Sequence, residues 1–246
     1  MTTDRAREAA RLLVEAHRTK MPIVGLPPSC LPRDPDEAYA VQDAIAALRG
    51  PVRGWKVSPS EPRRCATVFV VEPSGVTLEA AGLPGLGVEV EFGFRIARDM
   101  PPRATPYGEA EVFERLEFLP LIELIASRYI DKKSRSPLEL MADGMTHGAF
   151  VVGKPIAAWR DLDFKRQPVT LAINDKVVQS AVGKPTKGNP ADGIVWLANH
   201  VAGRSGGLRT GDVITTGALA GTTPAKAGDN AVGDWGPWGC VEVRFR

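Results

Sequence analysis

The 246-residue sequence predicts an α+β protein with a helical N-terminal portion and a larger, mainly β portion. Two amphipathic helical patterns lie before residue 50. From residue 52 onward, apolar runs and alternating apolar and polar residues dominate, separated by short segments rich in Gly and Pro. We therefore expect residues 1–55 to form a helical portion packed against one larger domain, residues 56–246, which contains only a few helices.

Composition restricts the classes of partner. The chain is 43% apolar, and its net charge is +2 with positive and negative residues well mixed. The sequence therefore predicts no broad charged surface that would bind nucleic acid or membranes. No segment approaches the ~20 apolar residues of a membrane span, and the first 20 residues are too charged for a secretion signal. Three scattered cysteines predict neither a disulfide framework nor a zinc site. We expect a cytoplasmic protein that binds small molecules or copies of itself.

The helical portion has clear boundary signals. Asp4 can cap a first helix, whose apolar residues recur every three or four positions. A Pro-rich link, residues 22–32, follows it. Asp34 suits the N-cap of a second helix, Pro35 its first turn, and Gly50 a left-handed stop.

The second portion begins with β patterns. We expect a strand over 52–57, a loop over 58–64, strand-rich sequence over 67–79 and a strand over 88–96. A helix is predicted over 108–117. The apolar run 118–126 predicts a strand covered on both faces.

Later segments alternate between the two patterns. Ser136 and Glu139 form a capping-box pattern at the start of a short helix. Strands are predicted over 149–153 and in a hairpin, 168–183, that turns at Asn174 and Asp175. A helix over 191–207 should end at Gly206 and bury one apolar face, made of Ile194, Leu197, Ala198 and Val201. At least two more strands are expected near the C-terminus.

The strand "GVEVEFGFRI" places Glu89 and Glu91 on the same face, because side chains two residues apart point the same way. A solvated polar face is the ordinary explanation of such a pair. Glu123 changes this interpretation, because apolar residues flank it on a strand covered on both faces. A carboxylate there must be protonated, paired with a base such as Arg95 or Arg128, or bound to a cation. Three converging carboxylates favour Mg²⁺, or Mn²⁺ as its substitute.

Several other residues are candidates for chemistry. Lys56, between Trp55 and Val57 at a strand edge, could hold a substrate carboxylate or enolate, although most such lysines are surface residues. His147 lies in the loop "DGMTHG" and is either catalytic or structural. The turn "TTGALAG" offers backbone N–H groups and two hydroxyls as a cradle for a small carboxylate, or is simply a tight turn.

Seven segments taken together resemble one known family. They are "DEAYAVQ", "RGWKV", "GVEVEFGF", "PLIELIASRY", "ADGMTHGAFVVG", "WLANHVA" and "LRTGDVITTGALAG". Their order is similar to that in the 2-keto-4-pentenoate hydratase and 4-oxalocrotonate decarboxylase family of the fumarylacetoacetate hydrolase superfamily. The resemblance implies a mixed β-roll core with an N-terminal helical part, and a catalytic role for residues 56–246. It also implies that the protein forms a homo-oligomer. A complex with a homologous enzyme of the family is a further possibility that the resemblance implies.

The resemblance assigns roles to the candidate residues. It implies that Glu89, Glu91 and Glu123 hold Mg²⁺ or Mn²⁺, that the metal chelates a short unsaturated 2-oxo acid, and that Lys56 assists enolate formation or proton transfer. His147 is a second catalytic candidate. The residues expected to bind the substrate are Ser58, Arg128, Thr215, Thr216 and Gly217.

We expect a metal-dependent lyase of aromatic compound catabolism that hydrates 2-hydroxypenta-2,4-dienoate or a close analogue. The same metal site would also serve a 4-oxalocrotonate-type decarboxylase or a hydrolase that cleaves carbon–carbon bonds of acylpyruvates such as fumarylpyruvate. Two loops depart from the family pattern: residues 57–67 lack an acidic residue in the expected place, and His147 stands where a small residue is usual. These departures leave open a third reading, a binding or partner subunit without turnover.

Overall fold

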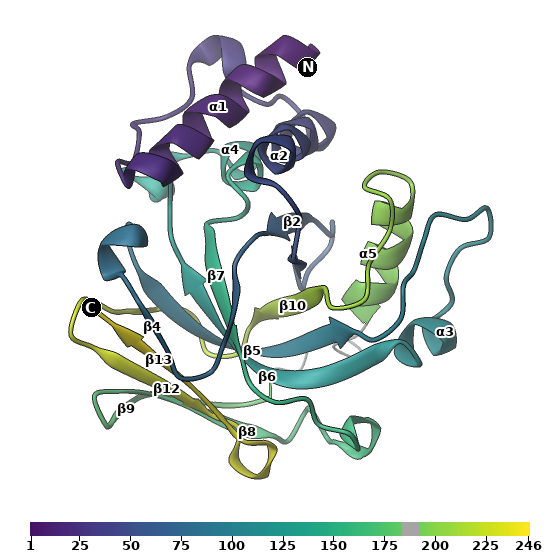
Figure 1. The fold of residues 1–246 in the computed structure, drawn as a ribbon, viewed down its shortest axis with the longest axis vertical. Coiled ribbons are helices and arrows are strands. Elements are labelled where there is room, and N and C mark those ends of the chain that lie inside the picture. Colours follow the sequence, from purple (N-terminus) through teal and green to yellow (C-terminus); the bar gives the residue numbers. More distant parts are fainter. Residues whose placement is uncertain (184–191) are drawn as a thin grey trace.

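Three helices gather at one end of the molecule in a computed structural model that describes residues 1–183 and 192–246 (Figure 1). Helix α1 (Thr3–Thr19) packs on α2 (Pro35–Arg49), and α2 packs on α4 (Pro137–Ala142). The buried face of α1 consists of four alanines and Leu13, and the small alanines let the two long helices approach closely. The described residues also form short 3₁₀ turns, η1 (Pro28–Cys30), η2 (Ala80–Gly82), η3 (Lys132–Ser134), η4 (Trp159–Asp161) and η5 (Gly236–Trp238).

The predicted caps are confirmed in two helices and wrong in one. Asp34 accepts a hydrogen bond from the backbone N–H of Glu37, and Ser136 and Glu139 form the full capping box of α4. In α1, however, Thr2 occupies the N-cap position and Asp4 lies in the first turn. An acidic residue there still interacts favourably with the positive end of the helix dipole.

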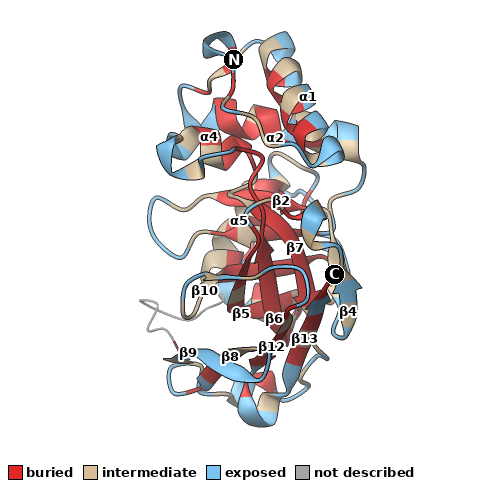
Figure 2. Ribbon diagram, turned by 90° about the vertical axis from the view of Figure 1, so that its left-hand side faces the viewer, coloured by how far each residue is buried: buried red, intermediate tan, exposed pale blue. Residues whose placement is uncertain are grey.

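The larger sheet runs in the order β2-β1-β10-β5-β6-β7-β3, and the short β11 also pairs with β5. Its strands are β1 (Gly54–Val57), β2 (Cys65–Val68), β3 (Val71–Pro73), β5 (Gly87–Ile96), β6 (Leu116–Ile125), β7 (His147–Val152), β10 (Val213–Ala218) and β11 (Thr223–Pro224). Both parallel and antiparallel pairs occur, so the sheet is mixed, as expected for the α+β class. The long central strands β5 and β6 are buried along nearly their whole length (Figure 2).

The smaller sheet runs in the order β4-β13-β12-β8-β9. Its strands are β4 (Val76–Leu78), β8 (Pro168–Ile173), β9 (Lys176–Val182), β12 (Asn230–Asp234) and β13 (Cys240–Phe245). The predicted hairpin is confirmed: β8 pairs with β9, and Asn174 and Asp175 have φ values of 50° and 65° at the turn. Positive φ at both central residues suits the right-handed twist of a two-residue hairpin.

The core lies between the two sheets. Strand β5 packs on β8, and β13 packs on both β6 and β7. Aromatic rings fill part of this space in edge-to-face and tilted contacts, which bury large apolar areas. These rings belong to Phe92, Phe94, Phe118, Trp159, Phe164 and Trp238.

Two helices cover the far end of the larger sheet, α3 (Glu109–Phe113) and α5 (Asp192–Ala202) (Figure 1). The predicted inward face of α5 is confirmed, because Ile194, Leu197, Ala198 and Val201 are fully buried. Both helices are shorter than predicted. Helix α3 ends early because Leu116 already begins β6, and α5 ends at Ala202, before Gly206. Residue 191, predicted to start this helix, lies outside the described residues.

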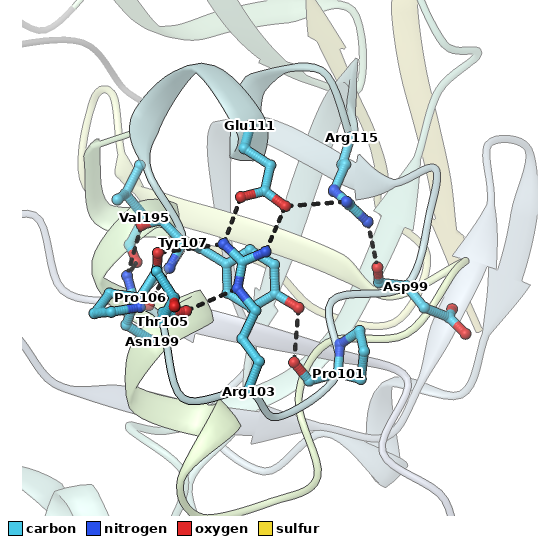
Figure 3. A network of polar contacts seen from close by, with 10 residues as sticks. All are labelled: Asp99, Pro101, Arg103, Thr105, Pro106, Tyr107, Glu111, Arg115, Val195 and Asn199. Atoms are coloured by element: carbon cyan, nitrogen blue, oxygen red, sulfur yellow. Dashed lines mark hydrogen bonds and ion pairs between the residues drawn. The ribbon is translucent and has the colours of Figure 1, made fainter.

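A polar network joins α3 and α5 to the loop between β5 and α3 (Figure 3). The Arg103 guanidinium pairs with Glu111 and lies 3.7 Å from the ring centroid of Tyr107. The Asn199 side chain accepts from the Tyr107 backbone N–H at 2.7 Å and donates to its carbonyl at 3.0 Å. Asn199 therefore ties α5 to a loop about 90 residues away in the sequence.

In the described part of the chain, no helix combines the length and apolar character that a membrane crossing requires.

The N-terminal helical portion makes hydrogen bonds with the larger β portion. The Gln42 side chain of α2 donates to the carbonyls of Cys65 and Met141 and accepts from the N–H of Thr67. The division into residues 1–55 and 56–246 stays a prediction.

Candidate metal and substrate site

Three carboxylates meet on one face of the β5–β6 pair. Glu89 and Glu123 stand directly opposite each other in the antiparallel register, and Glu91 lies two residues along β5. One carboxylate oxygen of each lies within 4.8 Å of the others. Like charges directly opposite each other destabilise a sheet, so this register requires a compensating positive charge. The predicted shared face of Glu89 and Glu91 is thus confirmed, with Glu91 buried and Glu89 half-buried.

Burial makes this cluster costly. The side chains of Glu91 and Glu123 are fully buried, and Glu91 Oε1 and Glu123 Oε2 have no hydrogen-bond partner among the described residues. Burial and the repulsion of Glu123 hold the pKa of Glu91 well above its ordinary value. Burial likewise raises the pKa of Glu123, although Lys56 opposes this shift. Free, buried carboxylate oxygens are the donors that a hard divalent cation takes.

Lys56 is the basic residue that forms an ion pair with Glu123. Its Nζ lies 2.9 Å from Glu123 Oε1 and donates to the carbonyl of Met145 at 3.0 Å. Burial by itself would lower the pKa of Lys56, but the three carboxylates together raise it, so the ammonium form is held. The two arginines considered as partners of Glu123 have others: Arg95 pairs with Glu117, and Arg128 pairs with Asp143.

His147 lies on the other side of Glu123. Its Nδ1 is 3.0 Å from Glu123 Oε1, and its ring packs edge-on against Phe150. Burial, followed by the nearby charges of Lys56 and Arg128, holds the pKa of His147 well below its ordinary value. A neutral imidazole can donate from Nδ1 to the carboxylate, and this contact orients Glu123. His147 Nε2 is buried without a partner among the described residues.

A strained loop carries this histidine. Gly144, Met145 and Thr146 have φ values of 71°, 54° and 59°, and the last two are unusual for residues with a side chain. Arg128 anchors the loop by donating to the Asp143 carboxylate and carbonyl and to the carbonyl of His147. In this strained conformation, the Met145 carbonyl accepts a hydrogen bond from Lys56. These contacts occupy the Arg128 guanidinium, and its role in substrate binding stays a prediction.

The "TTG" turn at the end of β10 lies against Glu91. The Thr215 hydroxyl and the Gly217 N–H, at 2.9 Å, both donate to Glu91 Oε2. Gly217 has a φ of 111°, which a residue with a side chain would rarely adopt. Thr216 is buried beside them. Sequence reasoning missed Thr222, whose hydroxyl donates to Glu89, because only the pairing of β11 with β5 brings it there.

A cavity of about 400 Å³ lies beside the loop that carries His147. Met145 and Thr146 form part of its lining, and the Met145 carbonyl accepts a hydrogen bond from Lys56. Ser58 lines the cavity and accepts a hydrogen bond from the Arg64 N–H at 2.8 Å. The volume suits a short organic acid.

Comparison with known proteins identifies the family. The profile of the fumarylacetoacetate (FAA) hydrolase C-terminal domain matches residues 56–246. The chain belongs to the fumarylacetoacetate hydrolase family. Among its relatives are a 2-keto-4-pentenoate hydratase of Paraburkholderia xenovorans, 26% identical, and the TodF product hydratase of Pseudomonas putida, 29% identical. The first alignment covers 93% of this chain and 90% of the relative, and the second covers 92% and 90%.

A solved structure of another enzyme has the same fold. The 4-oxalocrotonate decarboxylase of Pseudomonas putida G7, complexed with magnesium and adipate, has a TM-score of 0.87 at 22% identity, over 100% of this chain and 99% of that one. The α+β fold and the expected fumarylacetoacetate hydrolase superfamily are therefore confirmed. As a member of the fumarylacetoacetate hydrolase family with hydratases among its relatives, the protein is an enzyme of the lyase type.

Proposed function

We propose that the protein is a metal-dependent lyase that adds water to 2-hydroxypenta-2,4-dienoate, or a close analogue, to form a 4-hydroxy-2-oxo acid. One observation carries the proposal: Glu89 and Glu123 face each other across β5 and β6, with Glu91 beside them and Lys56 in contact. The hydratases among the relatives support the reaction type.

The donor set fits Mg²⁺ or Mn²⁺. Glu89, Glu91 and Glu123 offer hard oxygen ligands, and two buried oxygens of this set lack hydrogen-bond partners among the described residues. When bound, such an ion would supply Lewis-acid polarisation of the 2-oxo group and carboxylate of the substrate. Hydrogen bonds from Thr215 and Gly217 orient Glu91, and a hydrogen bond from Thr222 orients Glu89. Residues that bind metals are commonly held in place by such hydrogen bonds.

The residues around the cluster would transfer protons and hold Glu123 and the substrate in position. Lys56 holds a proton at Nζ beside the carboxylates, so it can donate that proton to substrate carbon and recover it when the next proton is removed. His147 acts through Glu123, because its Nδ1 contacts that carboxylate. Ser58 lines the cavity, and we expect it to contact the substrate chain.

Turnover measurements test the proposal. With Mg²⁺ and 2-hydroxypenta-2,4-dienoate, we expect formation of 4-hydroxy-2-oxopentanoate at about 1 per second or faster, and loss of turnover with a chelator. Product analysis separates the alternatives, because a decarboxylase releases carbon dioxide from 4-oxalocrotonate and a carbon–carbon hydrolase releases two acids. Absence of all three activities would favour the binding or partner subunit. The homo-oligomer, the cytoplasmic location and the setting in aromatic catabolism stay predictions.

A further inference from the structure

A second, much smaller cavity lies between the N-terminal helices and the larger sheet, and it shares no lining residue with the 400 Å³ cavity. Its volume is about 30 Å³, which holds one small ion or one or two water molecules. Helix α1 contributes His17 to its wall, α2 contributes Arg49, and β2 contributes Thr67; Arg128 and Asp143 also line it. Any ligand of this cavity must therefore be smaller than an organic acid.

The charges on this wall do not balance. Asp143 is the one acidic residue among the residues that line the cavity, and Arg128 already pairs with it. Arg49 belongs to none of the ion pairs within residues 1–183 and 192–246, and residues 184–191 contain no Asp or Glu. One positive charge on the wall thus has no carboxylate of the chain as a direct partner.

Arg49 is held in place by uncharged groups. Its Nη2 lies 3.0 Å from His17 Nε2, and its guanidinium carbon lies 4.4 Å from the ring centroid of Phe69. Burial, followed by the charge of Arg49, lowers the pKa of His17 to about 4, so the neutral ring accepts this hydrogen bond. Burial and the charge of Arg128 lower the pKa of Arg49 to about 10, which leaves the guanidinium positive at neutral pH.

Thr67 offers a second hydrogen-bond donor at this cavity. Cys65 and Thr67 lie two residues apart on β2 and therefore share a face. That face is turned toward α2, because Cys65 Sγ lies 3.8 Å from the Tyr39 hydroxyl. Thr67 is only 6% exposed, and its hydroxyl makes no hydrogen bond with another described residue, although its backbone N–H donates to Gln42. A buried hydroxyl without a partner requires one in the cavity.

We propose that this cavity binds one monatomic, monovalent anion such as chloride, with Arg49 as its charged partner and the Thr67 hydroxyl as a second donor. A water molecule could fill the same volume, but it would leave the guanidinium charge uncompensated. Arg128 neutralises Asp143, so that carboxylate does not prevent an anion from binding. The bound anion would join α1 and α2 to the Arg128–Asp143 pair that anchors the His147 loop.

Thermal unfolding in the presence of a chelator tests the proposal without metal or substrate. At constant ionic strength, potassium chloride replaces potassium gluconate, whose anion is too large for the cavity. Chloride at ten times its Kd should raise the unfolding midpoint of this 246-residue chain by about 3–6 °C. In Arg49→Gln the chloride-specific rise should disappear, because the positive charge on the wall is removed.

Arg53→Gln is the matched control, because Arg53 is a nearby exposed arginine that does not line the cavity. Its chloride-specific rise should equal that of the unaltered protein. Crystals soaked in bromide give a second measurement: an anomalous peak should lie beside Arg49 in the unaltered protein, which keeps the test valid if Arg49→Gln does not fold.

Four results would each overturn the anion site. They are no chloride-specific rise in the unaltered protein, an undiminished rise in Arg49→Gln, an equal loss in Arg53→Gln, and no anomalous peak in the cavity. The proposed function would stand in every case, because these measurements involve neither the carboxylate cluster nor the substrate.

Discussion

Glu91→Gln should show both effects of placing three carboxylates together, which are lower stability without metal and binding of Mg²⁺. The substitution keeps the side-chain size but removes one buried negative charge from the cluster. Without metal, the variant should be more stable by about 1–3 kcal/mol, since a buried carboxylate with too few partners is removed. In a chain of 246 residues, each kcal/mol shifts the midpoint of thermal unfolding by about 2–4 °C.

Mg²⁺ should stabilise the unaltered protein by about 2 kcal/mol more than it stabilises the variant. At a concentration of 100 times its Kd, Mg²⁺ stabilises the unaltered protein by about 2.7 kcal/mol, or about 5–10 °C. Loss of one of three ligands should raise Kd about a hundredfold or more, so the same Mg²⁺ adds at most about 0.4 kcal/mol. Thermal unfolding with a chelator and with Mg²⁺ measures both terms.

Glu117→Gln is the control for this experiment. Glu117 lies on β6 like Glu123, but it is partly exposed and pairs with Arg95 outside the cluster. Its Mg²⁺-dependent shift should equal that of the unaltered protein. If Glu91→Gln kept the full Mg²⁺-dependent shift, Glu91 would not be a ligand, and the reasoning from its buried, unpartnered oxygen would be refuted.

Three further variants test other parts of the structure. Lys56→Met should lower turnover by about 10²- to 10⁴-fold in initial-rate assays while the Mg²⁺-dependent thermal shift remains, because the three carboxylates stay in place. His17→Gln should reduce the acid sensitivity of the fold. Burial lowers the pKa of His17 to about 4, so stability is lost as pH falls from about 6.5 towards 4, by about 1–2 kcal/mol after allowance for solvent exposure. Urea unfolding at several pH values measures this loss. Gly54→Ala should destabilise by about 1–3 kcal/mol in the same assay, because a Cβ would lie 2.1 Å from the carbonyl oxygen of Val213.

Each of these variants has a control and a contrary outcome. Lys154→Met removes an exposed lysine and should leave turnover unchanged. If Lys56→Met lost the thermal shift as well, its effect would be on the metal site and not on proton transfer. An acid sensitivity that His17→Gln does not change would contradict the role of His17. Gly108→Ala, which meets no atom within 4 Å, should cost little, and an equal loss at both glycines would contradict the steric argument.

Local patterns predicted much of the fold because their causes are local. The alternation around Glu89 and Glu91, the cap at Asp34 and the turn at Asn174 depend on residues within a few positions of each other. Helix lengths were less predictable. Residues 114–117 could continue α3 by pattern, but Leu116 belongs to β6, which long-range pairing with β5 stabilises.

The sequence by itself determined that Glu89 and Glu91 share a face and that Glu123 lies on a covered strand needing a partner. The tertiary structure decided which partners these are. The β5–β6 register sets Glu89 opposite Glu123, the parallel pairing of β1 with β10 brings Lys56 to the same place, and β11 adds Thr222. Strand register and the order of strands in a sheet depend on contacts between distant residues, which no local pattern encodes.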